Sequence, residues 1–187
     1  MSAPSSETRA KLARVRLLAL DVDGVLTNGS LYYGDGGETV KTFFARDGLG
    51  LRLLRECGVE VAVISGRESA AVANRMAELG IEHYYAGRED KRGALNELLA
   101  ALSIGADEVA FIGDDVPDLS VLRSVGVAIT VADGHSYVKD EAHWITDAPG
   151  GGGAVREVAD AILECQGKLR RACEKLLAQS DEELQQG

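Results

Sequence analysis

The sequence has few cysteines and no long apolar run. Its three cysteines, Cys57, Cys165 and Cys173, are odd in number and form no CxxC pair. We interpret them as buried or incidental thiols in a reducing compartment, not as disulfides or a zinc site. No apolar run approaches the roughly 20 residues that span a bilayer. The first run, residues 15–20, continues directly into acidic residues, which is not the pattern of a secretory signal. These absences predict a cytoplasmic protein without a membrane anchor.

Positive charge is also scarce. The chain carries 20 lysines and arginines against 30 aspartates and glutamates, a formal net charge of −10. Basic residues cluster only at Lys168, Arg170 and Arg171. This composition makes binding to nucleic acid or to an anionic membrane a poor hypothesis. With 187 residues and a hydrophobic content of 45%, the chain suits one globular domain and is short for two.

Short apolar runs alternate with helical patterns along the chain. The runs show little polar alternation, which is typical of parallel strands buried on both faces; they cover residues 15–20, 59–64, 109–112 and 125–131. Helical patterns cover residues 49–57, 69–79, 92–102 and 154–179, and Gly58 and Gly80 are placed as C-terminal caps. This order predicts an α/β fold, with a doubly wound, mostly parallel, Rossmann-like sheet.

One segment interrupts the alternation. Residues 29–44 hold two β-prone arms, 31–33 and 39–44, around the turn sequence GDGG, which predicts a β-hairpin flap inserted after the first strand. The same patterns predict the domain organisation. We expect a flexible N-terminal arm over 1–12, a single domain over 13–167 and a helical extension of unassigned role over 168–187.

Polar side chains follow three of the apolar runs. The first run is followed by DVDGVLT at residues 21–27, the second by Ser65, Gly66 and Arg67, and the third by GDDVPD at residues 113–118. In an open parallel sheet, ligands bind beyond the carboxyl ends of the strands. Three strand ends would therefore deliver carboxylates, a hydroxyl group and glycine turns to one edge of the sheet.

The acidic residues of this edge predict a metal site. Asp21 and Asp23 are alternate residues of an extended segment, so their carboxylates point the same way. Like charges at short distance are unfavourable, and a hard divalent cation relieves them. Further oxygen atoms come from Asp114, Asp115 and Asp118 without histidine or thiol ligands, so Mg²⁺ fits better than Zn²⁺. A single DxD pair is more often a solvated loop or a helix cap, but two acidic motifs at separate strand ends favour the metal.

The same residues suit phosphoryl transfer. A carboxylate beside a phosphate group can attack phosphorus and form an aspartyl-phosphate. Cations and hydrogen-bond donors must then screen the repulsion between the two anions. Ser65 offers a hydroxyl group, and Lys91, at the entry of a helical stretch, offers a positive charge. Without the other motifs, Lys91 would be explained equally well as a surface lysine.

Four segments resemble the four motifs of the haloacid dehalogenase superfamily, in their order and with suitable spacing. They are DVDGVLT at 21–27, ISGR at 64–67, Lys91 within GREDKRGAL, and GDDVPDL at 113–119. The resemblance implies that Asp21 is the nucleophile and Asp23 the general acid/base. It also implies the remaining roles: phosphate partners Ser65 and Lys91, and Mg²⁺ held by Asp21, the carbonyl of Asp23 and Asp114, with Asp118 and Asp115 in the outer coordination sphere.

The spacing resembles the capless group of this superfamily. Asp21 and Ser65 are 44 residues apart, and Ser65 and Lys91 are 26 apart, which leaves no room for a lid domain beyond the hairpin. The segments KTFFARDGLGL at 41–51 and APGGGGAVREVADAIL at 148–163 resemble the capless phosphatases that act on 3-deoxy-D-manno-octulosonate 8-phosphate in lipopolysaccharide precursor synthesis.

That resemblance implies a phosphorylated sugar-acid substrate. Related phosphatases of nonulosonate 9-phosphates tend to carry glutamate where Arg67 stands, so Arg67 favours the octulosonate, with the nonulosonate or another sugar phosphate as the alternative. Gly66, Arg67, Lys91 and Arg75 are implied in substrate binding. The resemblance further implies a homotetramer in which subunits share their active sites.

Two other classes of protein share part of this pattern. A non-catalytic phospho-switch similar to a receiver domain also has an acidic cluster, a phosphorylated aspartate, a hydroxyl group and a lysine. Receivers carry the acceptor on a middle strand, however, and a switch needs no proton shuttle at Asp23. A degenerate member acting as a binding module is disfavoured because every motif residue is present.

Overall fold

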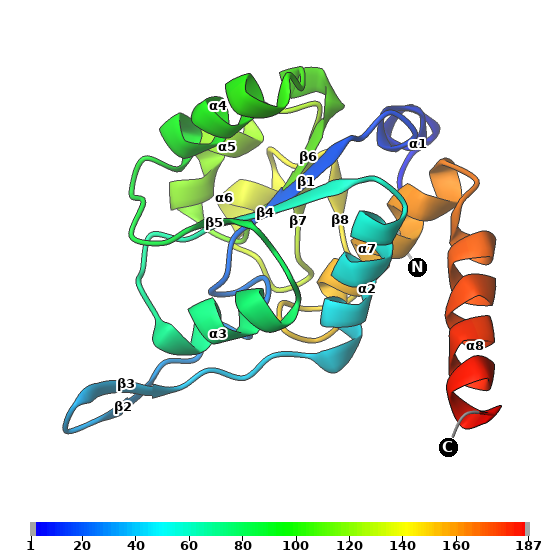
Figure 1. Cartoon of the computed structure of the whole chain (residues 1–187). Coiled ribbons are helices and arrows are strands. Elements are labelled where there is room, and N and C mark those ends of the chain that lie inside the picture. The colour runs from blue at the N-terminus through cyan, green and yellow to red at the C-terminus, as the bar shows by residue number, and fades with distance from the viewer. Residues whose placement is uncertain (1–2, 186–187) are drawn as a thin grey trace.

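The computed structural model describes residues 3–185, with side chains over 3–178, and is built around a parallel sheet (Figure 1). Six strands pair in the order β5-β4-β1-β6-β7-β8, and every pairing in this sheet is parallel. The strands are β1 (Leu17–Leu20), β4 (Glu60–Ile64), β5 (His83–Tyr85), β6 (Val109–Ile112), β7 (Val127–Thr130) and β8 (Trp144–Ile145). The predicted α/β class with a mostly parallel sheet is confirmed.

Strand side chains alternate between two apolar layers, because successive side chains of a strand point to opposite faces. In β1, Leu18 and Leu20 pack into one core cluster, and Leu17 and Ala19 pack into the other. The first cluster is covered by α1 (Ser6–Leu12), α2 (Ala45–Glu56), α3 (Ala70–Glu78) and α7 (Ala154–Cys165), and the second by α4 (Lys91–Leu102), α5 (Leu119–Leu122) and α6 (Ser136–Lys139). Figure 1 shows α4 and α5 on one side of the sheet and α2 and α3 on the other. The sheet is therefore doubly wound, as predicted.

The sequence patterns located the four inner strands and missed the two edge strands. The run at 109–112 coincides with β6, and the other three runs contain slightly shorter strands. β5 and β8 have three and two residues, which is too short for a recognisable period. They form because neighbouring strands supply backbone partners, as in the pairings of Tyr85 with Ile64 and of Ile145 with Thr130.

The N-terminal segment differs from the flexible arm expected over residues 1–12. It contains α1, whose start is capped because the Thr8 N–H donates to the Ser5 Oγ atom at 3.1 Å. At the other end of this helix, Leu12 is fully buried in the core cluster that α7 also lines. The expectation was wrong for residues 6–12, because a capped helix of seven residues with Thr8 and Leu12 buried packs this polar stretch against α7, while residues 1–2 lie outside the described part of the chain.

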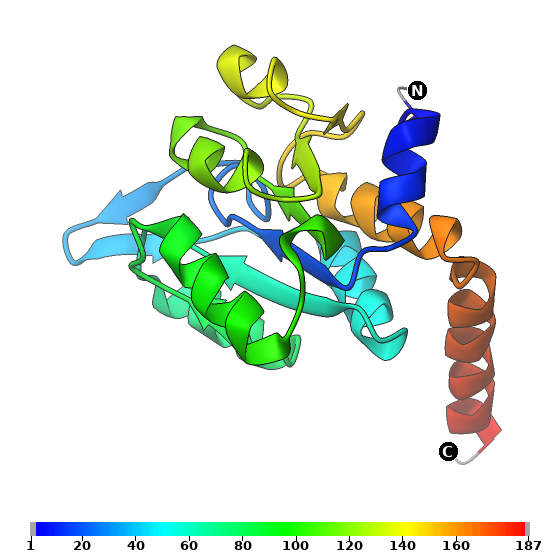
Figure 2. The same cartoon turned by 90° about the horizontal axis from the view of Figure 1, so that it is seen from above.

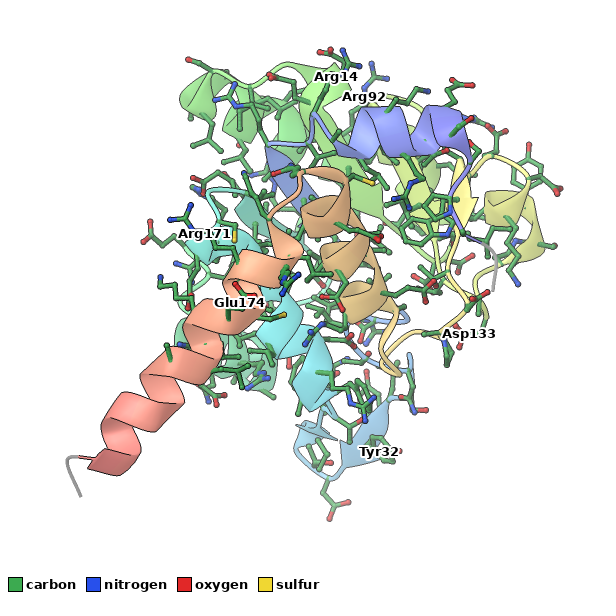
Figure 3. The ribbon with its side chains drawn as sticks, turned by 90° about the vertical axis from the view of Figure 1, so that its right-hand side faces the viewer. Arg14, Tyr32, Arg92, Asp133, Arg171 and Glu174 are labelled. Carbon is green, nitrogen blue, oxygen red and sulfur yellow. The ribbon has the colours of Figure 1, made fainter. Side chains whose placement is uncertain are left out.

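The predicted hairpin flap is present and projects from the sheet layer (Figures 1 and 3). β2 (Tyr32–Gly34) pairs antiparallel with β3 (Gly37–Val40) across a turn at Asp35 and Gly36. The second strand is shorter than the predicted arm, because the chain leaves the hairpin after Val40 and runs to α2. Exposed apolar side chains are concentrated on this flap, namely Leu31, Tyr32, Tyr33 and Val40.

The helical pattern at 154–179 forms two helices, α7 and α8 (Leu169–Gln185), which divide near residue 168, where the helical extension was expected to begin. The chain turns at 166–168, and α8 leaves the body at the end opposite the hairpin (Figures 1 and 2). Ala172 is buried near the start of α8, whereas Leu177 is 67% exposed. Figure 3 shows Arg171 and Glu174 on this helix. Within residues 3–185, no helix combines the length and the apolar content that a membrane span requires.

Candidate active site

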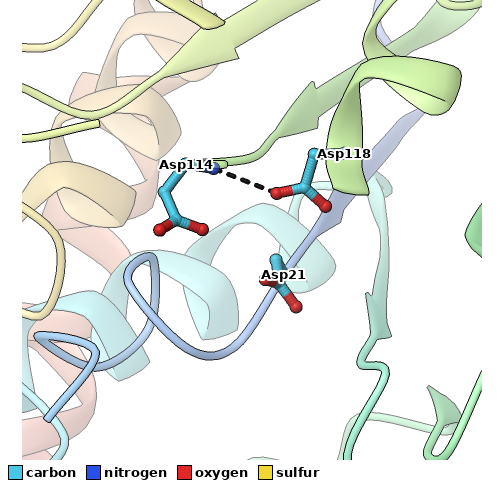
Figure 4. Close-up of side chains that lie close together, drawn as sticks. All are labelled: Asp21, Asp114 and Asp118. Atoms are coloured by element: carbon cyan, nitrogen blue, oxygen red, sulfur yellow. Dashed lines mark hydrogen bonds between the residues drawn. The ribbon is translucent and has the colours of Figure 1, made fainter. Parts of the chain in front are cut away.

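Three carboxylates meet where two neighbouring strands end. β1 and β6 pair in register, Leu20 opposite Ile112, so Asp21 and the loop after Ile112 leave the sheet side by side. The Asp21 N–H donates to the Ile112 carbonyl oxygen at 3.0 Å. Asp21, Asp114 and Asp118 each offer a carboxylate oxygen within 4.8 Å of the others (Figure 4). We call these three residues the acidic cluster.

Lys91 is buried against the acidic cluster. It is the first residue of α4, and its Nζ atom lies 2.9 Å from Asp21 Oδ1 and 2.7 Å from Asp118 Oδ1. Burial by itself would lower the pKa of Lys91, but the charges of Asp21 and Asp118 outweigh it and raise this pKa. Lys91 therefore stays protonated beside Asp21, and the surface-lysine interpretation is wrong.

Asp118 uses both of its carboxylate oxygens within the protein. Its Oδ2 atom accepts from the backbone N–H group of Asp114 at 3.0 Å (Figure 4). The Asp115 N–H donates to the same oxygen at 3.5 Å, while the Oδ1 atom accepts from Lys91. Asp115 itself is exposed and caps the Val116 N–H at 2.8 Å. This geometry makes Asp118 an anchor for Lys91 and for the loop that carries Asp114, and leaves Asp21 and Asp114 as the more available oxygen donors.

The acidic cluster raises the pKa of two of its members. Burial, followed by the charge of Asp118, raises the pKa of Asp21 to about 6, although Lys91 opposes this shift. Burial and the charges of Asp118 and Asp21 raise the pKa of Asp114 to about 7. Carboxylates held this close are stabilised by a hard cation, and an all-oxygen donor set suits Mg²⁺. The residues present therefore fit the predicted metal.

Gly24 allows the loop after β1 to approach the acidic cluster. Its φ angle is +87°, and a Cβ atom at this position would lie 2.1 Å from Asp114 Oδ2. Gly150 lies against the other side of this loop, where its Cβ would be 1.8 Å from the Gly24 carbonyl oxygen. The glycine-rich segment 150–153 is thus packed on the DxDG motif of its own chain.

Ser65 lies one strand away from Asp21. It follows β4, which pairs with β1, and it is only 3% exposed. Its Oγ atom accepts from the Arg67 N–H at 3.1 Å. Gly66 and Arg67 are exposed beside it, and the Arg67 guanidinium donates to the Tyr33 hydroxyl at 3.1 Å. Arg67 is therefore in contact with the hairpin flap.

Arg75 is not brought to the acidic cluster of its own chain. It lies on α3, where its Nη1 atom is 2.9 Å from Glu78 Oε2. The guanidinium also packs on Gly48 of α2, since a Cβ atom there would lie 2.3 Å from Arg75 Nη2. The implied role of Arg75 in substrate binding stays a prediction.

Asp23 has a partner that sequence patterns did not identify. Lys41 of the hairpin forms an ion pair with the Asp23 carboxylate, and its Nζ atom is 3.1 Å from Glu38 Oε2. Glu38 Oε1 in turn accepts from the Ser69 hydroxyl at 2.7 Å. Burial would lower the pKa of Lys41, but the hydrogen bonds that Lys41 donates to Asp23 and Glu38 raise it. Glu38 lies in no motif, and Lys41 begins the segment KTFFARDGLGL that resembles the family, but the resemblance assigned neither residue a role.

These contacts define a class of protein. An aspartate pair after one strand, a serine after the next, a lysine at a helix start and an acidic loop, all at one edge of a parallel sheet, make up the site of a haloacid dehalogenase-like hydrolase. Residues 85–158 match this family.

Comparison with individual relatives shows which family within this class the chain belongs to. Over 168 residues the chain is 45% identical to the Escherichia coli 3-deoxy-D-manno-octulosonate 8-phosphate phosphatase KdsC, covering 90% of this chain and 89% of that protein. A probable YrbI family phosphatase from Pseudomonas syringae superposes with a TM-score of 0.90 at 46% identity, covering 92% and 98% of the two chains. The Moraxella catarrhalis octulosonate phosphatase, crystallised with magnesium, phosphate and KDO, superposes at 0.87 and 41% identity, covering 91% and 98%. The chain belongs to the 3-deoxy-D-manno-octulosonate 8-phosphate phosphatase family of these hydrolases.

Proposed function

We propose that this protein is a Mg²⁺-dependent phosphatase that hydrolyses 3-deoxy-D-manno-octulosonate 8-phosphate to the free sugar acid and inorganic phosphate. The observation that carries the proposal is the placement of Asp21, buried at a strand end and paired with Lys91 at 2.9 Å beside two further carboxylates. The relative crystallised with magnesium, phosphate and KDO supports the choice of metal and substrate.

Two displacements at phosphorus account for the reaction. A carboxylate oxygen of Asp21 attacks phosphorus and the bond to the sugar oxygen breaks, while Asp23 donates a proton to that oxygen. Water then attacks the aspartyl-phosphate, Asp23 takes up its proton, and Asp21 and inorganic phosphate are released. Lys91 and Ser65 stabilise the charge on the phosphoryl oxygens. Mg²⁺, held by Asp21, the Asp23 carbonyl and Asp114, would supply the positive charge that lets a carboxylate approach a phosphate dianion.

Specificity for the sugar acid is assigned to the exposed rim of the site. Arg67 and Gly66 are exposed next to the buried Ser65, and Arg67 carries the positive charge that a sugar-acid carboxylate needs. Arg75 is assigned to the same substrate from the family resemblance. A nonulosonate 9-phosphate is the alternative substrate, which a glutamate at the position of Arg67 would have favoured.

We further propose a cytoplasmic homotetramer with active sites at the subunit interfaces. The hairpin supports this assembly, because Tyr32 and Tyr33 are 47% and 63% exposed and a flap of this size cannot cover them alone. Closed symmetric assemblies are the norm for such contacts. The cytoplasmic location is supported by the three cysteines, all of which are free thiols.

A substrate panel tests the proposal. Free phosphate is measured with the octulosonate 8-phosphate, a nonulosonate 9-phosphate and simple sugar phosphates, each with Mg²⁺ and with excess chelator. We expect the highest kcat/KM for the octulosonate, and activity that disappears with the chelator and returns with Mg²⁺. Full activity in excess chelator would refute the metal, and a higher kcat/KM for another phosphate would refute the substrate. A protein that takes up one phosphoryl group without turnover would instead be a switch.

A further inference from the structure

The base of the hairpin carries a lysine that none of the four sequence motifs includes. Lys41 follows β3, and its side chain is 1% exposed although neighbouring Val40 is 49% exposed. Lysine is almost never this buried unless it is paired. The burial of the Lys41 side chain within its own chain therefore marks a built contact, in contrast to the exposed Leu31, Tyr32, Tyr33 and Val40 of the flap.

Lys41 is the centre of a chain of polar contacts that leads to Asp23. Its Nζ atom forms an ion pair with the Asp23 carboxylate and lies 3.1 Å from Glu38 Oε2. The other oxygen of Glu38 accepts from the Ser69 hydroxyl at 2.7 Å. Ser69 precedes α3 in the connection that also carries Ser65 and Arg67. The contacts thus join the flap to the loop that follows β4.

A carboxylate that shuttles a proton must be aimed at the reacting oxygen atom. Asp23 has two rotatable side-chain bonds and a side chain that is 22% exposed, so the surrounding loop alone does not fix it. An ammonium group on one of its oxygens, itself held by Glu38, selects one orientation. Misplacing a catalytic group by about 1 Å can cost on the order of 100-fold in rate.

We propose that Lys41 is a positioning residue that acts through Asp23, holding this carboxylate in its working orientation and coupling it to the hairpin flap. The proposal rests on the phosphatase function proposed above. Lys91 has the equivalent place beside Asp21, where it lies between two carboxylates at 2.9 and 2.7 Å. Each of the two catalytic aspartates thus has its own buried lysine.

A kinetic double-mutant cycle tests the proposal. Lys41→Met, Asp23→Asn and the double variant are assayed at saturating Mg²⁺. We expect Lys41→Met to lower kcat about 10- to 100-fold, with little change in KM. On the Asp23→Asn background the same change should lower kcat less than about 3-fold, because its effect passes through Asp23. An equal loss on both backgrounds, or a change in KM alone, would overturn the proposal.

Thr39→Val is the matched control within the hairpin. It removes the hydrogen bond from the Thr39 hydroxyl to the Tyr32 carbonyl oxygen at 3.1 Å without touching Asp23. We expect its kcat to stay within about 2-fold of wild type, as for a surface change away from the site. A loss as large as that of Lys41→Met would show that hairpin integrity is the cause and would overturn the positioning role.

Ser69→Ala serves if Lys41→Met does not fold. It breaks the far end of the contact chain without leaving a buried charge unpaired. We expect a loss of about 2- to 5-fold in kcat that vanishes on the Asp23→Asn background; an unchanged rate, or an additive loss, counts against the proposal. The cycle is also run with ribose 5-phosphate. If the wild-type protein hydrolyses ribose 5-phosphate but not the octulosonate 8-phosphate, the proposed substrate is refuted. The test of Lys41 still stands in that case, because the cycle is measured with ribose 5-phosphate.

Discussion

Two lysines near the sheet edge each lie between a pair of carboxylates, and the two arrangements differ in how they are built. The inner lysine cluster is Asp21, Lys91 and Asp118, and the outer lysine cluster is Asp23, Lys41 and Glu38. Every residue of the inner cluster comes from a strand end or a helix start of the main layer. Two of the three in the outer cluster come from the projecting hairpin.

The burial of the carboxylates follows this difference. The inner carboxylates have side chains that are 12% and 1% exposed, whereas those of the outer cluster are 22% and 19% exposed. Charges interact more strongly where water is excluded. The inner lysine cluster is therefore suited to the covalent step at phosphorus. The outer lysine cluster is suited to a proton transfer, whose impairment lowers the rate without abolishing the reaction. Substitutions in the two clusters should separate these roles.

The largest effect is expected at Asp21. Asp21→Asn removes the nucleophile, so steady-state phosphate release should fall by about 10⁴-fold or more. Circular dichroism should show an unchanged fold. Asp140→Asn, an exposed aspartate beyond α6, is the matched control and should retain wild-type activity. Appreciable steady-state release by purified Asp21→Asn would disprove the nucleophile assignment and, with it, the distinction between the clusters.

Asp23→Asn should lower kcat by less than Asp21→Asn does. General acid–base catalysis contributes about 10²- to 10⁴-fold, and the loss of kcat should fall in that range. If hydrolysis of the aspartyl-phosphate becomes rate-limiting, phospho-enzyme will accumulate, which acid quench and mass spectrometry can detect. A near-native rate would show that Asp23 is not the proton shuttle.

Sequence patterns found the inner cluster and missed most of the outer one for a physical reason. Strand ends are visible as the points where apolar runs stop, and parallel register brings those points together, so the sequence predicts that Asp21 meets the loop that carries Asp114 and Asp118. Lys41 and Glu38 reach the site only because the hairpin docks on the loop after β4. The docking contacts join Glu38 to Ser69 and Tyr33 to Arg67, and no local periodicity encodes them. The edge strands escaped detection because two or three residues are too few for a recognisable period.

Metal affinity should distinguish two members of the acidic cluster. Asp114→Ala removes an available oxygen donor, while Asp118→Ala removes an anchor whose oxygens already accept from Lys91 and from backbone N–H groups. Outer-sphere changes typically weaken metal binding about 10- to 100-fold, so Asp114→Ala should exceed this range and Asp118→Ala should fall within it. Isothermal titration with Mg²⁺ measures both, and the reverse order would exchange their roles.

The metal-free protein should lose stability as pH rises. The folded-state pKa values of Asp21 and Asp114, about 6 and about 7, lie above the ordinary value of 3.8, so between these limits the native state binds more protons than the unfolded state. This contribution is fully present below the ordinary pKa and is lost as pH passes through 6 to 7. In chelator, the Tm should be higher at pH 5.5 than at pH 7.5 by several degrees, at about 2–4 °C per kcal/mol.

Asp114→Asn should shrink that difference and stabilise the metal-free protein at pH 7.5. Saturating Mg²⁺ should also shrink the difference, because the ion competes with protons, and a Tm that rises with pH in chelator would contradict the prediction.

The smallest effect is expected for α8, which projects from the body as the hairpin does. Its start is attached through Ala172, which is 8% exposed, and through an ion pair of Lys175 with Glu56 at 3.7 Å, whereas Leu177 is 67% exposed. Neither lysine cluster includes a residue of this helix, and it lies at the end of the molecule opposite the hairpin (Figures 1 and 2). Deleting residues 169–187 should therefore leave kcat and KM within about 2-fold of wild type, and lower the Tm by only a few degrees, as expected when little apolar area is exposed. Light scattering on the same sample reports the assembly state, which should be unchanged if the hairpin alone forms the subunit contacts. A large loss of activity with the fold intact would mean that α8 acts on the active site of another subunit. The two segments that project from the body, α8 and the hairpin, would then both be functional elements.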